Sequence, residues 1–328
     1  MMAFKLFAAL LPFLVLAAPA PLQEKPSGLS KSAEFVLEGG TSFDYVSVDA
    51  AGNRLFIAHG PKVDVLDLKK GTLLGEISGV DGSHGAIAVH EVKRGFATAG
   101  RKNRLIAFDL ETFKTQKEIE TGQGPDALLY VPSAGEVWTF NGKGRSISCV
   151  DATTLEVKAT IPLEGKPEAP ADHPEKGLVY VNLEDKSSIA VVDSKKHAVI
   201  ATHPLAPGEE PTGLALDAKN GLLFAGCGNK KLVALDVSTW KVAGTADIGE
   251  HCDGVAFDPG TGNVFASAVD KTGGLHVQGP ASFEPLTPIE TKGGKTCALD
   301  PQTHTLYVMS GPGRGAAGTV KVLVFSPK

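Results

Sequence analysis

A repeat of 40 to 44 residues constrains the fold of this chain more than any other feature. Seven polar or charged residues recur at that spacing, starting from Asp44, and an aromatic residue follows each of them twelve positions later. The aromatics are Phe56, Phe96, Trp138, Tyr180, Phe224, Phe265 and Tyr307. Aromatic residues make up only 6% of the chain, so agreement at all seven positions indicates seven repeated units.

Each unit contains four short apolar or β-branched runs separated by turn residues. The first unit shows this in the runs NRLFIA (53–58), KVDVLD (62–67) and TLLGEI (72–77). An aspartate ends the third run in five units, where its carboxylate can accept hydrogen bonds from the amides of the following turn. These residues are Asp67, Asp109, Asp151, Asp193 and Asp236. The pattern predicts an all-β fold, a seven-bladed β-propeller with four antiparallel strands in each blade.

The two ends of the chain indicate how the ring closes. Residues 34–39 (EFVLEG) are similar to fourth strands such as KEIETG (117–122), whereas the chain ends after VKVLVF (320–325), which is typical of a third strand. We therefore expect the N-terminal strand to complete the last blade, within a single propeller domain spanning 33–328.

The residues before the propeller have the pattern of an export signal. Lys5 precedes an apolar run from Leu6 to Leu16, and Ala18-Pro19-Ala20 resembles a cleavage site. We expect a signal peptide over 1–20, a flexible lead over 21–32, and a periplasmic or secreted protein. The apolar run is too short to span a membrane, and no later stretch reaches eighteen apolar residues.

Two repeats carry a family resemblance. The segments GLVYVNLEDKSSIAVVDSKKHAVIAT (177–202) and GLLFAGCGNKKLVALDVSTWKVAGT (221–245) resemble the YVTN-repeat, YncE-like β-propellers of bacterial exported proteins. The resemblance covers about residues 34–326, and the motif itself reads YVNL at 180–183. Propellers of this kind and their relatives include ligand-binding proteins, nucleic-acid binders, surface proteins and lactonase-like enzymes, so the resemblance implies the fold rather than one activity.

The polar residues that begin the seven units are the leading site candidates. In a propeller the innermost strands start on one face, so these residues should surround the mouth of the central channel. We call them the mouth ring: Asp44, His84, Asp126, Glu168, Thr212, Asp253 and Lys295. Asp44, Asp126, Glu168 and Asp253 can ligate a hard divalent cation, or carboxylates and His84 can perform acid–base chemistry. Alternatively, the ring only lines a water-filled channel.

Loops on the mouth face add further candidates. His59 is expected near His84, and Arg101 and Arg145 belong to a set of basic loop residues that can contact an anion. The formal net charge of −5 argues against wholesale capture of nucleic acid. The chain lacks HExxH, CxxC and G-x-S-x-G motifs, and without CxxCH no covalent c-type haem is expected.

Four cysteines occur in a chain that we expect to be exported, where disulfides are permitted. Cys227 is expected in the mouth-face loop of the fifth unit and Cys252 in the connection from the fifth to the sixth unit, so these two are the candidate pair. Cys149 and Cys297 are expected to pack as small apolar residues.

Together these features favour a non-catalytic protein that binds a small ligand or protein partner at the channel mouth. Two alternatives remain open. One is a metal-assisted, lactonase-like hydrolase with His84 as its acid or base, and the other is binding of nucleic acid or another polyanion by the basic loops.

Export is directly testable. Intact-mass analysis of the protein from its native host should show a species lacking at least the first seventeen residues. A cytosolic species that retains Met1 or Met2 would contradict this prediction.

Overall fold

A computed structural model describes residues 26–39, 42–269, 274–279, 283–312 and 318–328. The predicted signal peptide and the first part of the predicted lead lie outside these residues. The described chain forms seven four-stranded antiparallel sheets, and its helical residues are confined to three short 3-10 turns. These turns are η1 (His90–Val92), η2 (Gly100–Lys102) and η3 (Glu184–Lys186).

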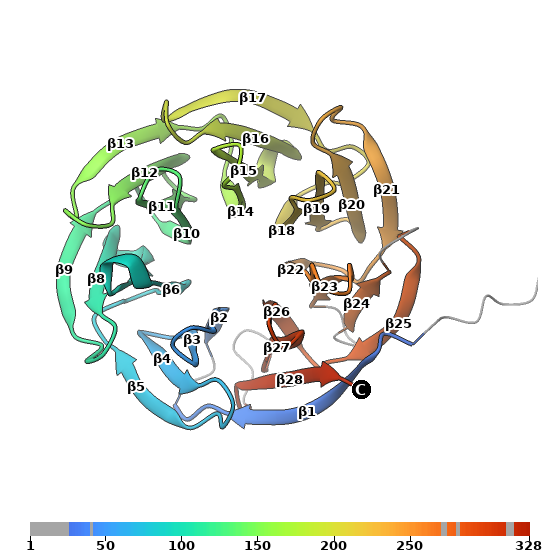
Figure 1. The fold of residues 1–328 in the computed structure, drawn as a ribbon, viewed down its shortest axis with the longest axis horizontal. Helices are drawn as coiled ribbons and strands as arrows, with labels where there is room; N and C mark the ends of the chain where they lie inside the picture. The colour runs from blue at the N-terminus through green and yellow to red at the C-terminus, as the bar shows by residue number, and fades with distance from the viewer. Residues whose placement is uncertain (1–25, 40–41, 270–273, 280–282, 313–317) are drawn as a thin grey trace, which may run out of the picture.

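The sheets stand in a ring, each with its first strand toward the centre and its fourth strand on the rim (Figure 1). The first blade contains β2 (Phe43–Asp49), β3 (Arg54–His59), β4 (Lys62–Asp67) and β5 (Leu73–Ile77). The second contains β6 (Ala86–Val89), β7 (Arg94–Ala99), β8 (Arg104–Asp109) and β9 (Thr115–Glu120). The third contains β10 (Pro125–Val131), β11 (Glu136–Asn141), β12 (Ser146–Asp151) and β13 (Val157–Pro162).

The remaining blades follow the same order. The fourth contains β14 (Pro167–His173), β15 (Leu178–Leu183), β16 (Ser188–Asp193) and β17 (Ala198–Pro204). The fifth contains β18 (Pro211–Asp217), β19 (Leu222–Cys227), β20 (Lys231–Asp236) and β21 (Val242–Asp247). The sixth contains β22 (Cys252–Phe257), β23 (Val264–Ala268), β24 (Gly274–Gln278) and β25 (Pro285–Glu290). The seventh contains β26 (Gly294–Asp300), β27 (Thr305–Ser310), β28 (Lys321–Pro327) and β1 (Leu29–Val36).

The N-terminal strand closes the ring, as predicted. β1 pairs antiparallel with β28, from Leu29 opposite Pro327 to Val36 opposite Lys321. The strand begins earlier than the sequence suggested, because residues 29–32 belong to β1 rather than to a flexible lead. The last blade therefore combines both ends of the chain, and its outer strand covers the edge of β28.

The repeated aromatics pack between blades. Phe56 of the first blade contacts Phe108 of the second, with ring centroids 5.8 Å apart. Trp138 and Tyr180 are fully buried against neighbouring blades in the same way. Because each blade uses the next as its apolar cover, the core is a set of interfaces arranged around the ring.

The aspartates that end the third strands cap the following turns, also as predicted. Asp67 Oδ1 accepts hydrogen bonds from the amides of Lys69 and Lys70 at 3.0 and 2.8 Å. Asp109, Asp151, Asp193 and Asp236 do the same in their own turns. These bonds lower the pKa of each carboxyl, because they stabilise its charged form.

A second repeated device follows each of these aspartates. The residue four positions later adopts positive φ and is called here the turn wedge; the five wedges are Gly71, Phe113, Leu155, His197 and Trp240. Trp240 lies 5.8 Å from the Tyr180 ring of the preceding blade, so a wedge side chain reaches across a blade boundary. Gly71 is the exception because the Phe35 ring of β1 fills its place, and a Cβ there would come within 2.1 Å of that ring.

This closure predicts different outcomes for two truncations. A mature chain starting at residue 27 should be as stable as the full mature chain, whereas one starting at residue 38 loses β1 and the buried Phe35 and Leu37. Burying each side chain contributes about 1.5–3 kcal/mol, so the denaturant midpoint should fall clearly.

Neighbouring residues of β1 provide a matched control. Phe35→Ala should lower the midpoint and Val36→Ala should not, because Phe35 is 8% exposed and Val36 is 58% exposed. Equal midpoints for the two truncations would show that β1 does not stabilise the ring.

Candidate functional site

Backbone bulges bring the mouth ring together. In six blades the ring residue is the second residue of the innermost strand, as Asp44 is in β2 and Asp126 is in β10. The pairing register of these strands shifts just there, for example between Phe43 and Val46. A bulge changes the direction in which a side chain points, so the repeat turns these residues away from regular sheet pairing.

Five ring residues form a continuous chain of alternating charge. Lys295 Nζ lies 3.2 Å from Asp253 Oδ2 and 3.0 Å from Asp44 Oδ1. His84 Nδ1 lies 2.6 Å from the other oxygen of Asp44 and 3.3 Å from Asp126 Oδ1. The chain thus crosses the boundaries between blades six, seven, one, two and three.

The other two ring residues have different partners. Glu168 Oε1 lies 2.6 Å from the ammonium of Lys166, which also contacts Glu184 Oε2 at 2.5 Å. Thr212 donates its hydroxyl hydrogen bond to the backbone carbonyl of Cys252. Lys166 and Glu184 were not predicted as site residues, because they lie outside the repeated ring position.

The pKa values divide the carboxylates into two groups. Burial favours the neutral form of Asp44, but the His84 hydrogen bond and the Lys295 charge outweigh it and lower its pKa. Burial raises the pKa of Asp126 to about 6, although His84 opposes the shift. Burial and the neighbouring charge of Asp126 also raise the pKa of Glu168. Asp126 and Glu168, on adjacent blades, are therefore carboxylates that resist ionisation together.

His84 and Lys295 favour their charged forms. Burial opposes the charge on each, but Asp44 and Asp126 raise the pKa of His84, and Asp44 and Asp253 raise that of Lys295. Burial raises the pKa of Asp253 despite Lys295.

The donor atoms of Asp44, His84 and Asp126 lie within 4.8 Å of one another, a spacing that can hold a metal ion. Glu168 and Asp253, the other two predicted metal ligands, lie outside that group.

Tyr45 is a site residue that the sequence reasoning missed. It follows Asp44, whereas the residue after the ring position in the next four blades is small, namely Gly85, Ala127, Ala169 and Gly213. With these residues except Gly213, Tyr45 lines a cavity of about 170 Å³. Burial raises the pKa of its phenol, and carboxylates from four blades, namely Asp126, Glu168, Asp253 and Asp44, raise it further. The phenol therefore lies among carboxylates that approach the channel from several sides.

Three predicted loop residues do not join the ring. His59 is 1% exposed and lies inside the first blade, with Nδ1 2.7 Å from Asp64 Oδ2, and no contact with His84 is seen among the described residues. Arg101 pairs with Asp81 at 3.2 Å, and Arg145 pairs with Asp185 at 2.7 Å. The mouth-face arginines are thus neutralised locally instead of forming an uncompensated basic rim.

All four cysteines are free thiols, so the predicted Cys227–Cys252 disulfide is not formed in this structure. Both side chains are buried, and each thiol instead contacts a carbonyl of its own strand at 3.6 Å, that of Ala225 for Cys227 and that of Gly254 for Cys252. Burial raises the pKa of Cys227 and Cys297 to about 12.

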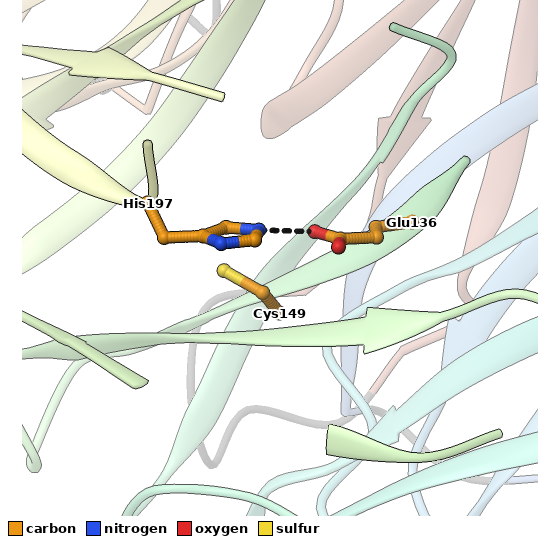
Figure 2. A group of neighbouring side chains, drawn as sticks. All are labelled: Glu136, Cys149 and His197. Atoms are coloured by element: carbon orange, nitrogen blue, oxygen red, sulfur yellow. Dashed lines mark hydrogen bonds and ion pairs between the residues drawn. The ribbon is translucent and has the colours of Figure 1, made fainter. Parts of the chain in front are cut away.

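Cys149 lies in the apolar core, as predicted. It also belongs to a polar cluster that the sequence did not predict. Figure 2 shows its thiol beside the His197 ring and the Glu136 carboxylate. His197 Nε2 lies 2.9 Å from Glu136 Oε2, and the three donor atoms lie within 4.8 Å of one another. We call Glu136, Cys149 and His197 the basal cluster. The residues are 13 and 48 positions apart in sequence, so no local motif reveals it.

No protein-family model and no curated protein sequence matches the chain. Its fold is nevertheless shared with solved structures. A chain in the structure titled "Crystal Structure of Mitotic Checkpoint Complex" aligns with a TM-score of 0.77 and 12% identity, covering 99% of each chain. At that identity the similarity supports the β-propeller fold alone, a scaffold compatible with partner binding. The YncE-like resemblance remains a prediction from the repeats.

None of the helical turns in the described residues has the length and apolar character needed to cross a membrane.

The raised pKa values predict that the mouth ring destabilises the fold at higher pH. A carboxyl whose folded-state pKa exceeds its unfolded value loses its stabilising contribution as pH rises through the folded pKa. Asp126→Asn with Glu168→Gln should therefore melt higher than wild type at pH 8, by about 1–2 °C for each kcal/mol of burial penalty and charge repulsion removed. The difference should disappear near pH 4.

His84 keeps Asp44 as a partner in this variant, and Lys166 keeps Glu184, so neither cation is left unpaired. Melting curves that shift equally at both pH values would contradict the electrostatic explanation.

Proposed function

We propose that this propeller is a binding protein for a small cationic ligand, most simply a divalent metal ion, held at the channel mouth. One observation carries the proposal: carboxylates outnumber basic groups there, and Asp126 and Glu168 both hold raised pKa values. The acidic residues are Asp44, Asp126, Glu168, Glu184 and Asp253, and the basic ones are His84, Lys166 and Lys295. A cation would relieve this excess of negative charge.

Binding is favoured over catalysis because the sequence has no HExxH metal motif and no G-x-S-x-G nucleophile motif to accompany His84. Nδ1 of His84 is engaged by both Asp44 and Asp126. Oxygen ligands from several rigid strands suit a hard cation, and adjacent Asp44 and Asp126 supply such oxygens.

Binding of a polyanion is less favoured. Besides Arg101 and Arg145, the basic residues Arg104, Lys230 and Lys231 also have acidic partners within 2.8 Å. A polyanion would have to displace these carboxylates before it gained the positive charge.

We further propose that the protein acts outside the cytoplasm as a YncE-like propeller. The N-terminal signal pattern and the YVNL-type repeats support this assignment. A protein partner is also compatible with a propeller scaffold, since the structural neighbour is a chain of a protein complex.

Calorimetric titration with Ca²⁺, Mg²⁺ and Mn²⁺ tests the binding proposal. Wild type should bind at least one of them with one ion per chain. Asp126→Asn with Glu168→Gln should weaken binding on the order of 100-fold, because the Asp126 ligand and the nearby negative charge of Glu168 are both lost. Affinity should also fall as pH drops below about 6, where Asp126 becomes protonated.

The control is Asp81→Asn with Glu120→Gln, which removes the same charge from exposed loop and strand positions. It should bind as wild type does. No binding to wild type, or equal affinity for both double variants, would refute the proposal.

A further inference from the structure

The basal cluster lies on the face of the ring opposite the mouth. Innermost strands begin at the mouth, so the hairpin from β10 to β11 lies at the other end, and Glu136 is the first residue of β11. His197 lies in the turn between β16 and β17 of the next blade. Cys149 comes from β12, opposite Trp138 in the sheet. The cluster therefore bridges blades three and four and is separate from the mouth ring.

The positions equivalent to Cys149 and His197 in other blades show which residues packing alone requires. The residue equivalent to Cys149, paired with the blade aromatic, is Val65, Ala107, Val191 or Ala234. The other large wedges are Phe113, Leu155 and Trp240. The repeat therefore needs only an apolar residue at each position, whereas this blade boundary carries a thiol and an imidazole.

A structural contact between blades accounts for Glu136 and His197 but not for Cys149. Arg94, at the Glu136 position of the second blade, donates to the carbonyls of Ala152 and Thr153 in the next turn at 3.1 and 2.7 Å. The Glu136–His197 contact joins blades in the same way. This contact between blades does not require Cys149. The Cys149 sulfur nevertheless lies within 4.8 Å of the donor atoms of both Glu136 and His197 (Figure 2).

We propose that Glu136, Cys149 and His197 form a zinc-binding site with one carboxylate, one thiolate and one imidazole ligand. Tetrahedral zinc bonds to such donors at about 2.0–2.3 Å, which places the donors about 3.3–3.8 Å apart. The three donor atoms lie within 4.8 Å of one another, so side-chain shifts of about 1 Å bring them to the spacing that zinc needs. A mixed sulfur, nitrogen and oxygen set selects zinc over calcium or magnesium, which prefer oxygen alone.

The surroundings support the ligand assignment. Glu136 is 5% exposed, and Trp138 Nε1 donates to its Oε2 at 2.8 Å, an outer contact that orients a ligating carboxylate. The His197 side chain is 25% exposed, which gives the ion a path from solvent. On binding, the S–H bond of Cys149 breaks as the S–Zn bond forms, and the proton passes to solvent.

The test uses the full mature chain, stripped of metal with a chelator and kept reduced. After dialysis against Zn²⁺, elemental analysis should find a zinc ion that Cys149→Ala and His197→Leu do not retain. Co²⁺ in place of zinc should give the charge-transfer absorption of a cobalt–thiolate bond. Both variants copy residues used at the same positions in other blades, Ala107 and Leu155, so they should fold.

A Trp138 variant and tryptophan fluorescence provide two further tests. Trp138→Phe, which copies Phe56 and Phe96, should weaken zinc binding about 10–100-fold by removing the orienting hydrogen bond. In a Trp240→Phe background Trp138 is the sole tryptophan, and its emission should change on Co²⁺ binding.

The outcomes separate this site from the mouth. Asp126→Asn with Glu168→Gln should keep the cobalt–thiolate absorption, since those residues belong to the other site. Absence of that absorption in wild type, or zinc retained equally by the folded Cys149→Ala variant, would overturn the proposal.

Discussion

Every blade of this propeller relies on closure of the ring for its stability. Each blade buries its apolar residues against the next, so no blade is complete without its neighbours. The pairing of β1 with β28 joins the last blade to the first, and Phe35 of β1 occupies the place that a turn wedge fills elsewhere. The wedge position of the first blade is a glycine, Gly71, because a side chain there would occupy the space that the Phe35 ring needs.

The repeat separates packing from chemistry within each unit. The aromatic, the wedge and the capping aspartate serve the interfaces and turns. The aromatics and the aspartates stay similar in type around the ring, whereas the wedges range from Gly71 to Trp240. In six blades the ring residue lies at a bulge, and in the second blade His84 precedes β6, so the chemistry of this position can vary without cost to the sheet. That freedom allows carboxylate, imidazole and ammonium groups to alternate around one mouth.

Charge at the mouth is arranged for local pairing but not for complete neutrality. Asp44 is stabilised as an anion by His84 and Lys295, whereas burial raises the pKa of Asp126 and Glu168, and the charge of Asp126 raises that of Glu168 further. A fold selected for stability alone would not retain two such carboxyls on adjacent blades, and departures of this kind are typical of binding sites. The basal cluster also departs from the repeat, because polar donor groups lie at one blade boundary where other blades have apolar side chains.

Residue spacing alone predicts the architecture, because a period repeated seven times can be recognised without knowing any contact between residues. It also identified the mouth ring and the capping aspartates, since these positions recur in every or nearly every unit. Tertiary structure decided which residues meet. His59 lies inside its own blade, Cys227 and Cys252 contact separate carbonyls, and Tyr45 lies among the ring carboxylates. Glu136, Cys149 and His197 come from three strands or turns of two blades, so only the packing of one blade on the next brings their side chains together.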